Sequence, residues 1–485
     1  MITIKAKHSI FIMFMLLTVF QAKAQDNYTL YFMHTLPQAN ILNPAVQIPC
    51  KVYVGIPALS SIHVGYSNTL FRYKDIITTN QSGNSVFKPD YLINASGDLE
   101  NIRLETQISL IHFGFFYKDI YFNFHLQDKI DVGLNYSGNL ISLTLQGNAP
   151  HIGETFDVGG TALHGIYYRE WGIGASKKID NQWTLGIHAK LLFGKVNIQT
   201  RKKDLALTTT SDSLQLSASG HYLIKASPFV ITTDAQNQPT SIELVDASIV
   251  SLLLNRQNPG ISFDFGTLYQ LDDNTTVAAS LLDIGGIYWR YSPAQVDISG
   301  SYNFNGIQYD PLTGTFNNLD SVVNAAQDAY SYSTSQSSYF TFLTPKLYLG
   351  ASYDLNDWAN ASLTYRSEYY HGKILQGISP AINAKYKNFL AGSLSWTFTR
   401  GTLMNLGAGI SARTPTFGFY AIADNVYGMI KWKSTKFVNL RFGFNLLFGC
   451  SSGKSKGSSS AACSAYSNTL KKKQRLEELK SKNGK

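Results

Sequence analysis

Two histidines, His125 and His188, could take part in chemistry because each lies on the polar side of an alternating stretch, in "YFNFHLQ" (121–127) and "WTLGIHAKLLF" (183–193). A histidine beside a serine or aspartate can act as a general base, so a hydrolytic site is one interpretation. Coincidence is the other, because alternation places any histidine on one face or the other. The sequence has no His-Glu-x-x-His zinc motif and no calcium-binding loop. We therefore expect no enzymatic activity, no catalytic residue, no metal and no cofactor.

Four charged residues lie on the polar side of similar alternating stretches: Lys190, Asp264, Arg366 and Arg441. If these stretches enclose water, their charges set the selectivity for ions or solutes, and if the interior is plugged, they pair with the plug. With His125 and His188 they make up the candidate lining residues. Alternation alone does not decide between the open and the plugged interior.

The sequence does not support a phosphate-binding or nucleic-acid site. The segment "GCSSGKS" (449–455) resembles a phosphate-binding loop, but it has three residues between its glycines where that loop needs four. The formal charge of +9 is carried by the two ends, with Lys5, Lys7 and Lys23 at one end and nine Lys or Arg against two Glu after residue 449 at the other. The body between them is close to neutral, so we expect no nucleic-acid partner.

The first 24 residues have the pattern of a secretory signal peptide. A short basic start is followed by the apolar run "IFIMFMLLTVF" and by the small residues "AKA". A membrane anchor would need about 17–25 apolar residues, and here they run out too early. We predict cleavage before Gln25 and export of the mature chain.

Alternation of apolar and polar residues is the main signal in the rest of the chain. In "VNLRFGFNLLF" (438–448) the Val, Leu and Phe residues share one side of a strand and the Asn, Arg and Gly residues the other. Charged residues are only 15% of the chain, against about 25% in typical soluble domains. No later stretch reaches the roughly 18 apolar residues of a membrane helix. The apolar faces therefore belong to a soluble sandwich of two sheets, to a secreted β-helix or to a barrel in lipid.

The lengths of the connections favour the barrel. Short polar turns are expected at 127–129, 178–182, 271–274 and 355–358, and long connections at about 144–164, 196–260 and 290–344. Membrane barrels alternate short turns on one side with long loops on the other. We predict an all-β protein, a transmembrane antiparallel β-barrel of about 14 strands, within a range of 12–16. In this prediction 119–126 and 131–143 are separate strands, and 416–430 is another.

Four regions follow from these patterns: a signal peptide (1–24), an N-terminal plug or periplasmic segment with a possible first strand (25–105), the barrel (106–449) and a basic Ser/Gly/Lys-rich periplasmic tail (450–485). Three cysteines do not make a disulfide framework. Cys50 and Cys450 could form one bridge if both lie on the same side of the membrane. The alternative is that these two cysteines and Cys463 are isolated thiols.

The segments "YFMHTLPQANILNPA" (31–45) and "VYVGIPALSSIHVGY" (52–66) resemble the start of an uncharacterised family, domain of unknown function 5723. Members of this family look similar to the fatty-acid-transporter type of barrel and to the PorP/SprF membrane proteins of type IX secretion. The resemblance implies a Gram-negative outer-membrane barrel over about 25–449. The family motif carries no known chemistry, so no functional residue is transferred.

The expected function is that of a cell outer-membrane barrel which transports or handles a small solute, hydrophobic or otherwise. The alternative is a structural or type IX secretion-associated barrel that acts by binding partners. Outer-membrane lipid is one expected partner, and secretion or envelope proteins are others. Neither the solute nor the partner proteins are identified by the sequence.

Overall fold

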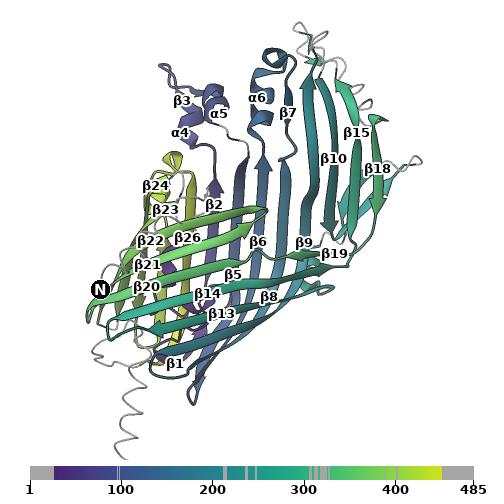
Figure 1. The fold of residues 1–485 in the computed structure, drawn as a ribbon. Helices are drawn as coiled ribbons and strands as arrows, with labels where there is room; N and C mark the ends of the chain where they lie inside the picture. Colours follow the sequence, from purple (N-terminus) through teal and green to yellow (C-terminus); the bar gives the residue numbers. More distant parts are fainter. Residues whose placement is uncertain are drawn as a thin grey trace, which may run out of the picture.

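The structure, a computed structural model, describes residues 27–95, 97, 99–210, 216–234, 239–245, 248–304, 309–310, 315–316, 325, 328–387, 389–399 and 402–450. Several predicted features lie outside these ranges: the signal peptide 1–24, its cleavage site at Gln25, Cys463 and the basic tail after Cys450. Figure 1 shows that long strands dominate the described residues and curve around a common interior.

Within the described ranges the wall has fourteen strand positions, and all neighbouring strands are antiparallel. Thirteen positions are single strands: β5 (Glu100–Tyr117), β6 (Ile120–Tyr136), β8 (Ala162–Lys178), β9 (Trp183–Thr209), β13 (Asn258–Gln270), β14 (Thr275–Trp289), β20 (Lys346–Asn356), β21 (Ala359–Tyr370), β22 (Lys373–Tyr386), β23 (Leu390–Thr399), β24 (Thr402–Arg413), β25 (Phe417–Ala423) and β26 (Phe437–Cys450). The fourteenth is shared by β1 (Cys50–Gly55) and β2 (Ile62–Asn68). Both pair with β26 on one side and β5 on the other, which closes the cylinder.

The predicted barrel and its strand number are confirmed, but two strand assignments were wrong. The segments predicted as separate strands, 119–126 and 131–143, belong largely to the single strand β6, and the expected turn at 127–129 lies in its middle. The polar run there imitates a turn because Asp128 faces outward, where it forms an ion pair with Arg169. The missing position is filled by β1 and β2, and β25 ends at Ala423, well before the predicted residue 430.

Short turns gather at one end of the cylinder. They join β5 to β6 at 118–119, β8 to β9 at 179–182, β13 to β14 at 271–274 and β20 to β21 at 357–358. The turn after β8 is fixed by Asp180, whose carboxylate accepts hydrogen bonds of 2.7 Å from the backbone N–H groups of Gln182 and Trp183. These hydrogen bonds lower the pKa of the Asp180 carboxyl. The long connections lie at the opposite end, which is the outer side in membrane barrels.

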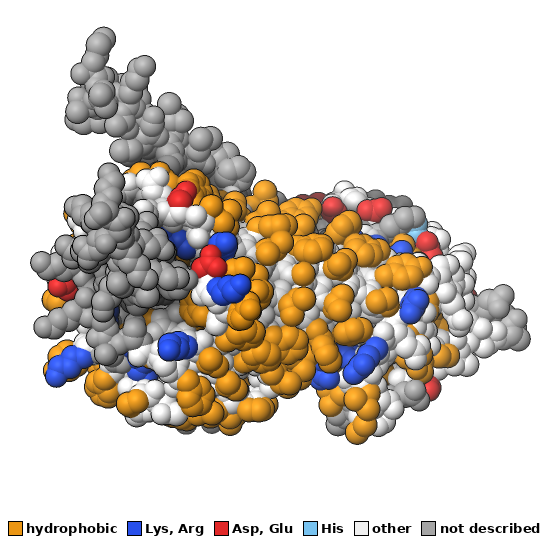
Figure 2. Space-filling view, turned by 90° about the horizontal axis from the view of Figure 1, so that it is seen from below, with side chains coloured by type: hydrophobic (Ala, Val, Ile, Leu, Met, Phe, Trp, Pro, Cys, Tyr) orange, Lys and Arg blue, Asp and Glu red, His pale blue; other side chains and the backbone are white. Residues whose placement is uncertain are grey.

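The two faces of the wall differ in chemistry as the alternation predicted. Exposed apolar side chains cover the outside, and Figure 2 shows them spread over the wall seen from below. Among the most exposed are Ile173, Leu191, Phe342, Ile382 and Leu394. Buried polar side chains such as Ser262, Thr364 and Asn405 line the inside. No helix in the described ranges is long and apolar enough to cross a bilayer.

Residues 27–48 fill the lumen at its short-turn half, and we call this segment the plug. It contains two short helices, α2 (Tyr28–Tyr31) and α3 (Ala39–Leu42), and most of its side chains are buried. It bonds to wall strands all around the cylinder, including Ser176 on β8, Thr267 on β13, Ser280 on β14, Ser395 on β23 and Asn445 on β26. Its apolar side chains pack against inward-facing wall residues such as Leu282 and Tyr420.

Glycines on the inner wall make room for the plug. A side chain at Gly186 would come within 2.2 Å of the Pro44 carbonyl oxygen, and one at Gly377 within 2.2 Å of the Tyr28 hydroxyl. Similar close approaches to plug residues occur at Gly266, Gly350, Gly407 and Gly409. Several inner-wall positions are therefore glycine because a larger side chain there would overlap the plug.

The outer end carries the remaining elements, several of which stand above the wall in Figure 1. Between β2 and β5 lie α4 (Tyr73–Ile76), β3 (Ile77–Thr79), β4 (Ser85–Phe87) and α5 (Pro89–Ala95); between β6 and β8 lie α6 (Gly138–Gln146), η1 (Ala149–His151) and β7 (Thr155–Asp157). The outer half of β9 leaves the cylinder and pairs with β10 (Leu216–Ser227). Beyond β10 the same sheet continues with β15 (Ala294–Phe304) and then β18 (Tyr330–Ser335). Smaller elements complete this end: β11 (Phe229–Thr233), β12 (Pro239–Leu244), α7 (Ile249–Leu254), β16 (Tyr309–Asp310), β17 (Thr315–Phe316), β19 (Tyr339–Phe342), α9 (Val426–Ile430) and η2 (Trp432–Ser434).

A disulfide bond joins Cys50 to Cys450 where the first and last wall strands meet. Both residues lie at the short-turn end, so the condition set for this bridge is met and the alternative of isolated thiols is wrong for these two cysteines. The bond links residues 400 positions apart in the sequence. It fixes the seam of the cylinder directly below the plug.

Removing this disulfide should weaken the barrel. We expect Cys50→Ser to lower the free energy of unfolding by about 2–5 kcal/mol, because a long loop of the unfolded chain is no longer closed. The loss is measured on a denaturing gel as the temperature at which half of the protein has changed from its folded to its unfolded mobility. Cys463→Ser is the control and should leave the midpoint temperature unchanged. If Cys50→Ser had the same midpoint temperature as the wild type, strand pairing alone would hold the seam.

Candidate functional site

The six residues predicted to line the lumen all face it. His125, His188, Lys190, Asp264, Arg366 and Arg441 are each at most 4% exposed. They are not spread along an open channel, however, because each one is bonded to another part of the chain. The structure divides them into three groups.

The first group joins His188 and Lys190 on β9 to Asp264 on β13. His188 Nδ1 is 3.1 Å from one Asp264 oxygen, and Lys190 Nζ is 2.6 Å from the other. On its far side His188 Nε2 lies 3.0 Å from the side-chain oxygen of the plug residue Asn40. This group therefore connects the wall charges to the plug.

Four further charged residues, Lys129, Glu170, Asp283 and Lys346, extend this group across the lumen. Glu170 bonds His125 and Lys129, each at 2.9 Å. Asp283 accepts from Lys190 at 2.8 Å and from Lys346 at 2.9 Å. We call the set of Lys129, Glu170, Lys190, Asp264, Asp283 and Lys346 the ion-pair layer. It lies directly beyond the plug and lines the inner wall over the neighbouring strands from β6 to β20.

Sequence reasoning missed these four residues, and for Lys129, Asp283 and Glu170 the reason can be identified. Lys129 falls in the polar run that imitates a turn. Asp283 has a φ of 61° in an irregular stretch of β14, where the register with β13 shifts and simple alternation fails. Glu170 in "YYREWG" follows Arg169, a charged residue that faces outward, so the two faces of this stretch do not separate into apolar and polar.

The second group lies around Arg366 on β21. Arg366 Nη2 is 2.6 Å from Glu368, and Glu368 also receives Arg103 from β5 at 3.0 Å. Arg103 further bonds Glu105 and Asp131, each at 2.6 Å. Because β5 and β21 are far apart in the strand order, these ion pairs draw two distant sides of the wall together.

The tip of the β21–β22 hairpin completes this closure. Tyr370 lies against Arg103, with the guanidinium carbon 4.0 Å from the ring centroid. The His371 ring stacks on His164 of β8 with 3.6 Å between centroids, and Lys373 Nζ donates to the Leu99 carbonyl at 3.0 Å. The hairpin thus crosses the outer mouth of the lumen, and we call it the hairpin closure.

The third group is Arg441 on β26, which holds the start of the plug. Its guanidinium donates to the side chains of Asn27, Ser61 and Gln107 at 3.1, 2.9 and 3.0 Å. A second anchor lies nearby at Asp424, whose carboxylate accepts from the backbone N–H groups of Asn27 and Thr29 at 2.7 and 2.8 Å. Arg441 therefore contacts neither of the other two groups through these bonds.

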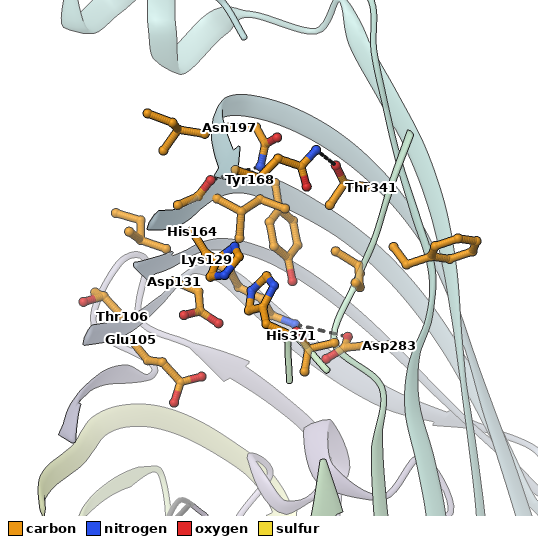
Figure 3. Close-up of a pocket in the computed structure, with 18 of the residues that line it drawn as sticks. Glu105, Thr106, Lys129, Asp131, His164, Tyr168, Asn197, Asp283, Thr341 and His371 are labelled. Carbon is orange, nitrogen blue, oxygen red and sulfur yellow. Dashed lines mark hydrogen bonds and ion pairs between the residues drawn. The ribbon is translucent and has the colours of Figure 1, made fainter. Parts of the chain in front are cut away.

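Two cavities of the described part of the chain lie on either side of the plug and the ion-pair layer. The outer one, of about 60 Å³, lies between the hairpin closure and the ion-pair layer. Figure 3 shows His164 and His371 beside each other there, near Lys129 and Asp131. The inner one, of about 240 Å³, lies at the short-turn end between plug residues 32–35 and wall residues that include Asn360 and Asn383. Among the described residues no group of His, Cys, Asp or Glu is arranged to hold a metal ion.

A closed antiparallel cylinder, apolar outside and polar inside, defines a membrane-spanning β-barrel protein, here one whose lumen is occupied by its own N-terminal segment. The chain belongs to the family of unknown function DUF5723, whose model matches residues 44–424. The resemblance seen in residues 31–66 is thereby confirmed. No curated protein matches the sequence.

Three solved structures to which this chain is similar are two toluene transporters and a FadL homologue. The toluene transporter TbuX of Ralstonia pickettii covers 85% of this chain and 94% of its own, with 10% identity and a TM-score of 0.40. The toluene transporter TodX of Pseudomonas putida covers 88% and 98%, with 10% identity and a TM-score of 0.40. A FadL homologue of Pseudomonas aeruginosa covers 89% and 100%, with 10% identity and a TM-score of 0.42.

Proposed function

We propose that this protein sits in the outer membrane and lets a small solute pass through its lumen when two internal closures open. The observation that carries the proposal is the pair of cavities on either side of the plug and the ion-pair layer. The two closures are the plug and the hairpin closure, and both are held across the lumen by non-covalent contacts. Such segments can move while the cylinder stays intact.

The outer cavity suggests the class of solute. One side is apolar, with Ile166, Tyr168 and Leu343 next to the buried cluster around Trp289. The other side carries Lys129 and Asp131. The cavity of about 60 Å³ is smaller than a ligand pocket, but when the closures move apart this lining suits a molecule with an apolar body and one charged end. We therefore propose a small amphipathic solute, which refines the hydrophobic solute expected from the sequence.

Uptake into proteoliposomes tests this function. A short alkyl sulfate is the probe, because it combines an apolar chain with a permanent charge, and sucrose is the polar control. We expect the alkyl sulfate to enter proteoliposomes faster than protein-free liposomes, while sucrose enters both at the same rate. Equal rates for the alkyl sulfate with and without protein, or a leak of sucrose through the protein, would contradict the proposal.

A charge on the apolar side of the outer cavity should reduce this uptake. Leu343→Asp places a carboxylate where the alkyl chain would lie, and an apolar group does not pack well against a buried charge. We expect the uptake of the alkyl sulfate to fall several-fold. Leu271→Asp, at an exposed leucine in the β13–β14 turn, is the matched control and should leave uptake unchanged. Equal uptake by the two variants would mean that the solute does not pass through this cavity.

A second function, the docking of an envelope or secretion partner, is favoured by the sheet that extends beyond the cylinder. Strand β18 pairs with β15 on one side, and within the described residues no strand pairs with its other edge. An unpaired edge can accept a strand from another protein. Ser333→Pro in β18 would remove a backbone donor. Loss of a co-purifying protein in this variant, with the barrel still folded, would support docking at this edge.

A further inference from the structure

Helix α7 lies on the outer face of the wall. Arg169 Nη1 and Lys195 Nζ donate to the carbonyl oxygen of Leu253 at the end of this helix, at 3.2 and 2.9 Å. Arg169 points away from the lumen, because its neighbours Tyr168 and Glu170 on β8 are buried inside it. The bonds from Arg169 therefore place the end of α7 outside the barrel.

The surroundings of α7 are apolar and open. Val250 and Leu254 are 64% and 65% exposed. The nearby outward ring of Trp171 has its centroid 6.4 Å from that of Phe124 and 6.3 Å from that of Phe193, so α7 borders an aromatic patch of the wall. A short apolar helix on a barrel wall is stable there when lipid covers it.

The position of α7 along the barrel corresponds to the outer edge of the wall. It directly precedes β13, which begins at Asn258, and the neighbouring strand β14 ends at Trp289. Both of these strand ends lie at the end of the cylinder opposite the short turns. The patch therefore lies where the apolar wall meets the outer headgroups of a bilayer.

Two guanidinium groups accompany the helix. Arg256 lies over the ring of Trp171, 5.6 Å from its centroid, and Arg290 Nε donates to the Gln257 carbonyl at 2.8 Å. Both side chains are exposed, and in the described part of the chain neither forms an ion pair. Arg169, in contrast, is neutralised by Asp128 through hydrogen bonds of 2.7 and 2.8 Å. Two positive charges thus remain uncompensated beside an apolar surface, and the chain links them closely, because Arg290 bonds Gln257, the residue after Arg256.

We propose that α7 with Arg256 and Arg290 binds the phosphate of an anionic lipid headgroup, with the acyl chains lying along the exposed leucine and valine side chains. Guanidinium groups present paired donors that match two phosphate oxygens. Attraction to a negatively charged headgroup and burial of the apolar helix face act together, as they do in interfacial helices. A membrane lipid fits this surface better than free phosphate because only the lipid covers Val250 and Leu254.

Native mass spectrometry of the full chain in detergent tests the proposal. The probes are phosphatidylglycerol and phosphatidylcholine with identical acyl chains. We expect the wild-type protein to retain phosphatidylglycerol in preference, and Arg256→Gln with Arg290→Gln to bind it roughly tenfold to thirtyfold more weakly, as expected for the loss of two interfacial charges. Binding of phosphatidylcholine should change little. Arg72→Gln with Lys74→Gln in and beside α4 is the control and should bind like the wild type.

Two outcomes would overturn the proposal. One is an unchanged affinity of the Arg256→Gln/Arg290→Gln variant for phosphatidylglycerol, with the variant shown to be folded by its gel mobility before heating. The other is displacement of the lipid by inorganic phosphate at a concentration similar to that of the lipid, which would mean that the patch recognises the anion without the apolar part.

Discussion

A variant that lacks residues 29–46 and also carries Gly133→Val is expected to turn the closed barrel into an open pore. The deletion removes the plug. At Gly133 a side chain would come within 2.2 Å of the Tyr370 hydroxyl, so valine should displace the Tyr370 ring that holds the hairpin closure against Arg103. In planar bilayers we expect the conductance to rise by more than about tenfold over the wild type, because barrels somewhat larger than this one hold an aqueous channel when empty.

The single changes should have smaller effects than the pair, because the closures lie in series. The plug deletion alone leaves the hairpin closure in place, and Gly133→Val alone leaves the plug. Gly392→Val is the matched control, since a side chain there meets no atom closer than 3.6 Å, and it should conduct like the wild type. A folded double variant with wild-type conductance would show that these segments do not close a passage.

Gly186→Val offers an independent route to the same state. Its side chain would lie 2.2 Å from the Pro44 carbonyl oxygen and 2.5 Å from the Ala45 nitrogen, so the plug backbone itself must move. In the Gly133→Val background it should raise conductance as the deletion does. Gel mobility before and after heating shows whether each variant has formed a barrel, so a failure to fold is distinguished from a closed lumen.

The second large effect is expected for Lys190→Met. Lys190 lies between Asp264 at 2.6 Å and Asp283 at 2.8 Å, and it is 3% exposed. Methionine keeps the length of the side chain but removes the charge, so buried carboxylates lose a partner. We expect the free energy of unfolding to fall by about 3–5 kcal/mol, which is typical when one partner of a buried ion pair is removed. Denaturant titration of the folded barrel, followed by tryptophan fluorescence, measures this change.

Lys177→Met is the matched control. Lys177 forms an ion pair with Asp119 at 3.1 Å, but both side chains are more than 40% exposed, so the same substitution should lower stability by less than about 1 kcal/mol. Asp283→Asn added to Lys190→Met should recover part of the loss, because it removes one of the carboxylates left without compensation. Equal losses for the two lysines would mean that the ion-pair layer is hydrated and contributes little.

Much of the wall could be predicted from the sequence, because a strand with lipid on one side and polar groups on the other must alternate. The prediction failed where that rule has local exceptions. Asp128 faces outward in the middle of β6 because Arg169 and α7 cover it, and this made one strand look like two. Pro57 and Ser60 interrupt the strand shared by β1 and β2, so its two halves looked unlike a membrane strand.

Individual charged residues of the lumen could be predicted from the sequence, but not which of them come together in one site. His188, Lys190 and Asp264 were found by alternation, yet their partners come from strands distant in the sequence or from the irregular stretch around Asp283. The plug was predicted only as a region, because its position depends on contacts such as that of Pro44 with Gly186. Pairwise contacts of this kind leave no periodic signal in a single sequence.

Hydrogen–deuterium exchange of the full chain in lipid nanodiscs tests most directly whether the protein's own N-terminal segment closes the lumen. Backbone amides of residues 28–46 should exchange as slowly as those of the wall strands and far more slowly than those of the exposed turn at 80–84. Fast exchange throughout 28–46, with the wall strands still protected, would mean that the lumen is not closed from within.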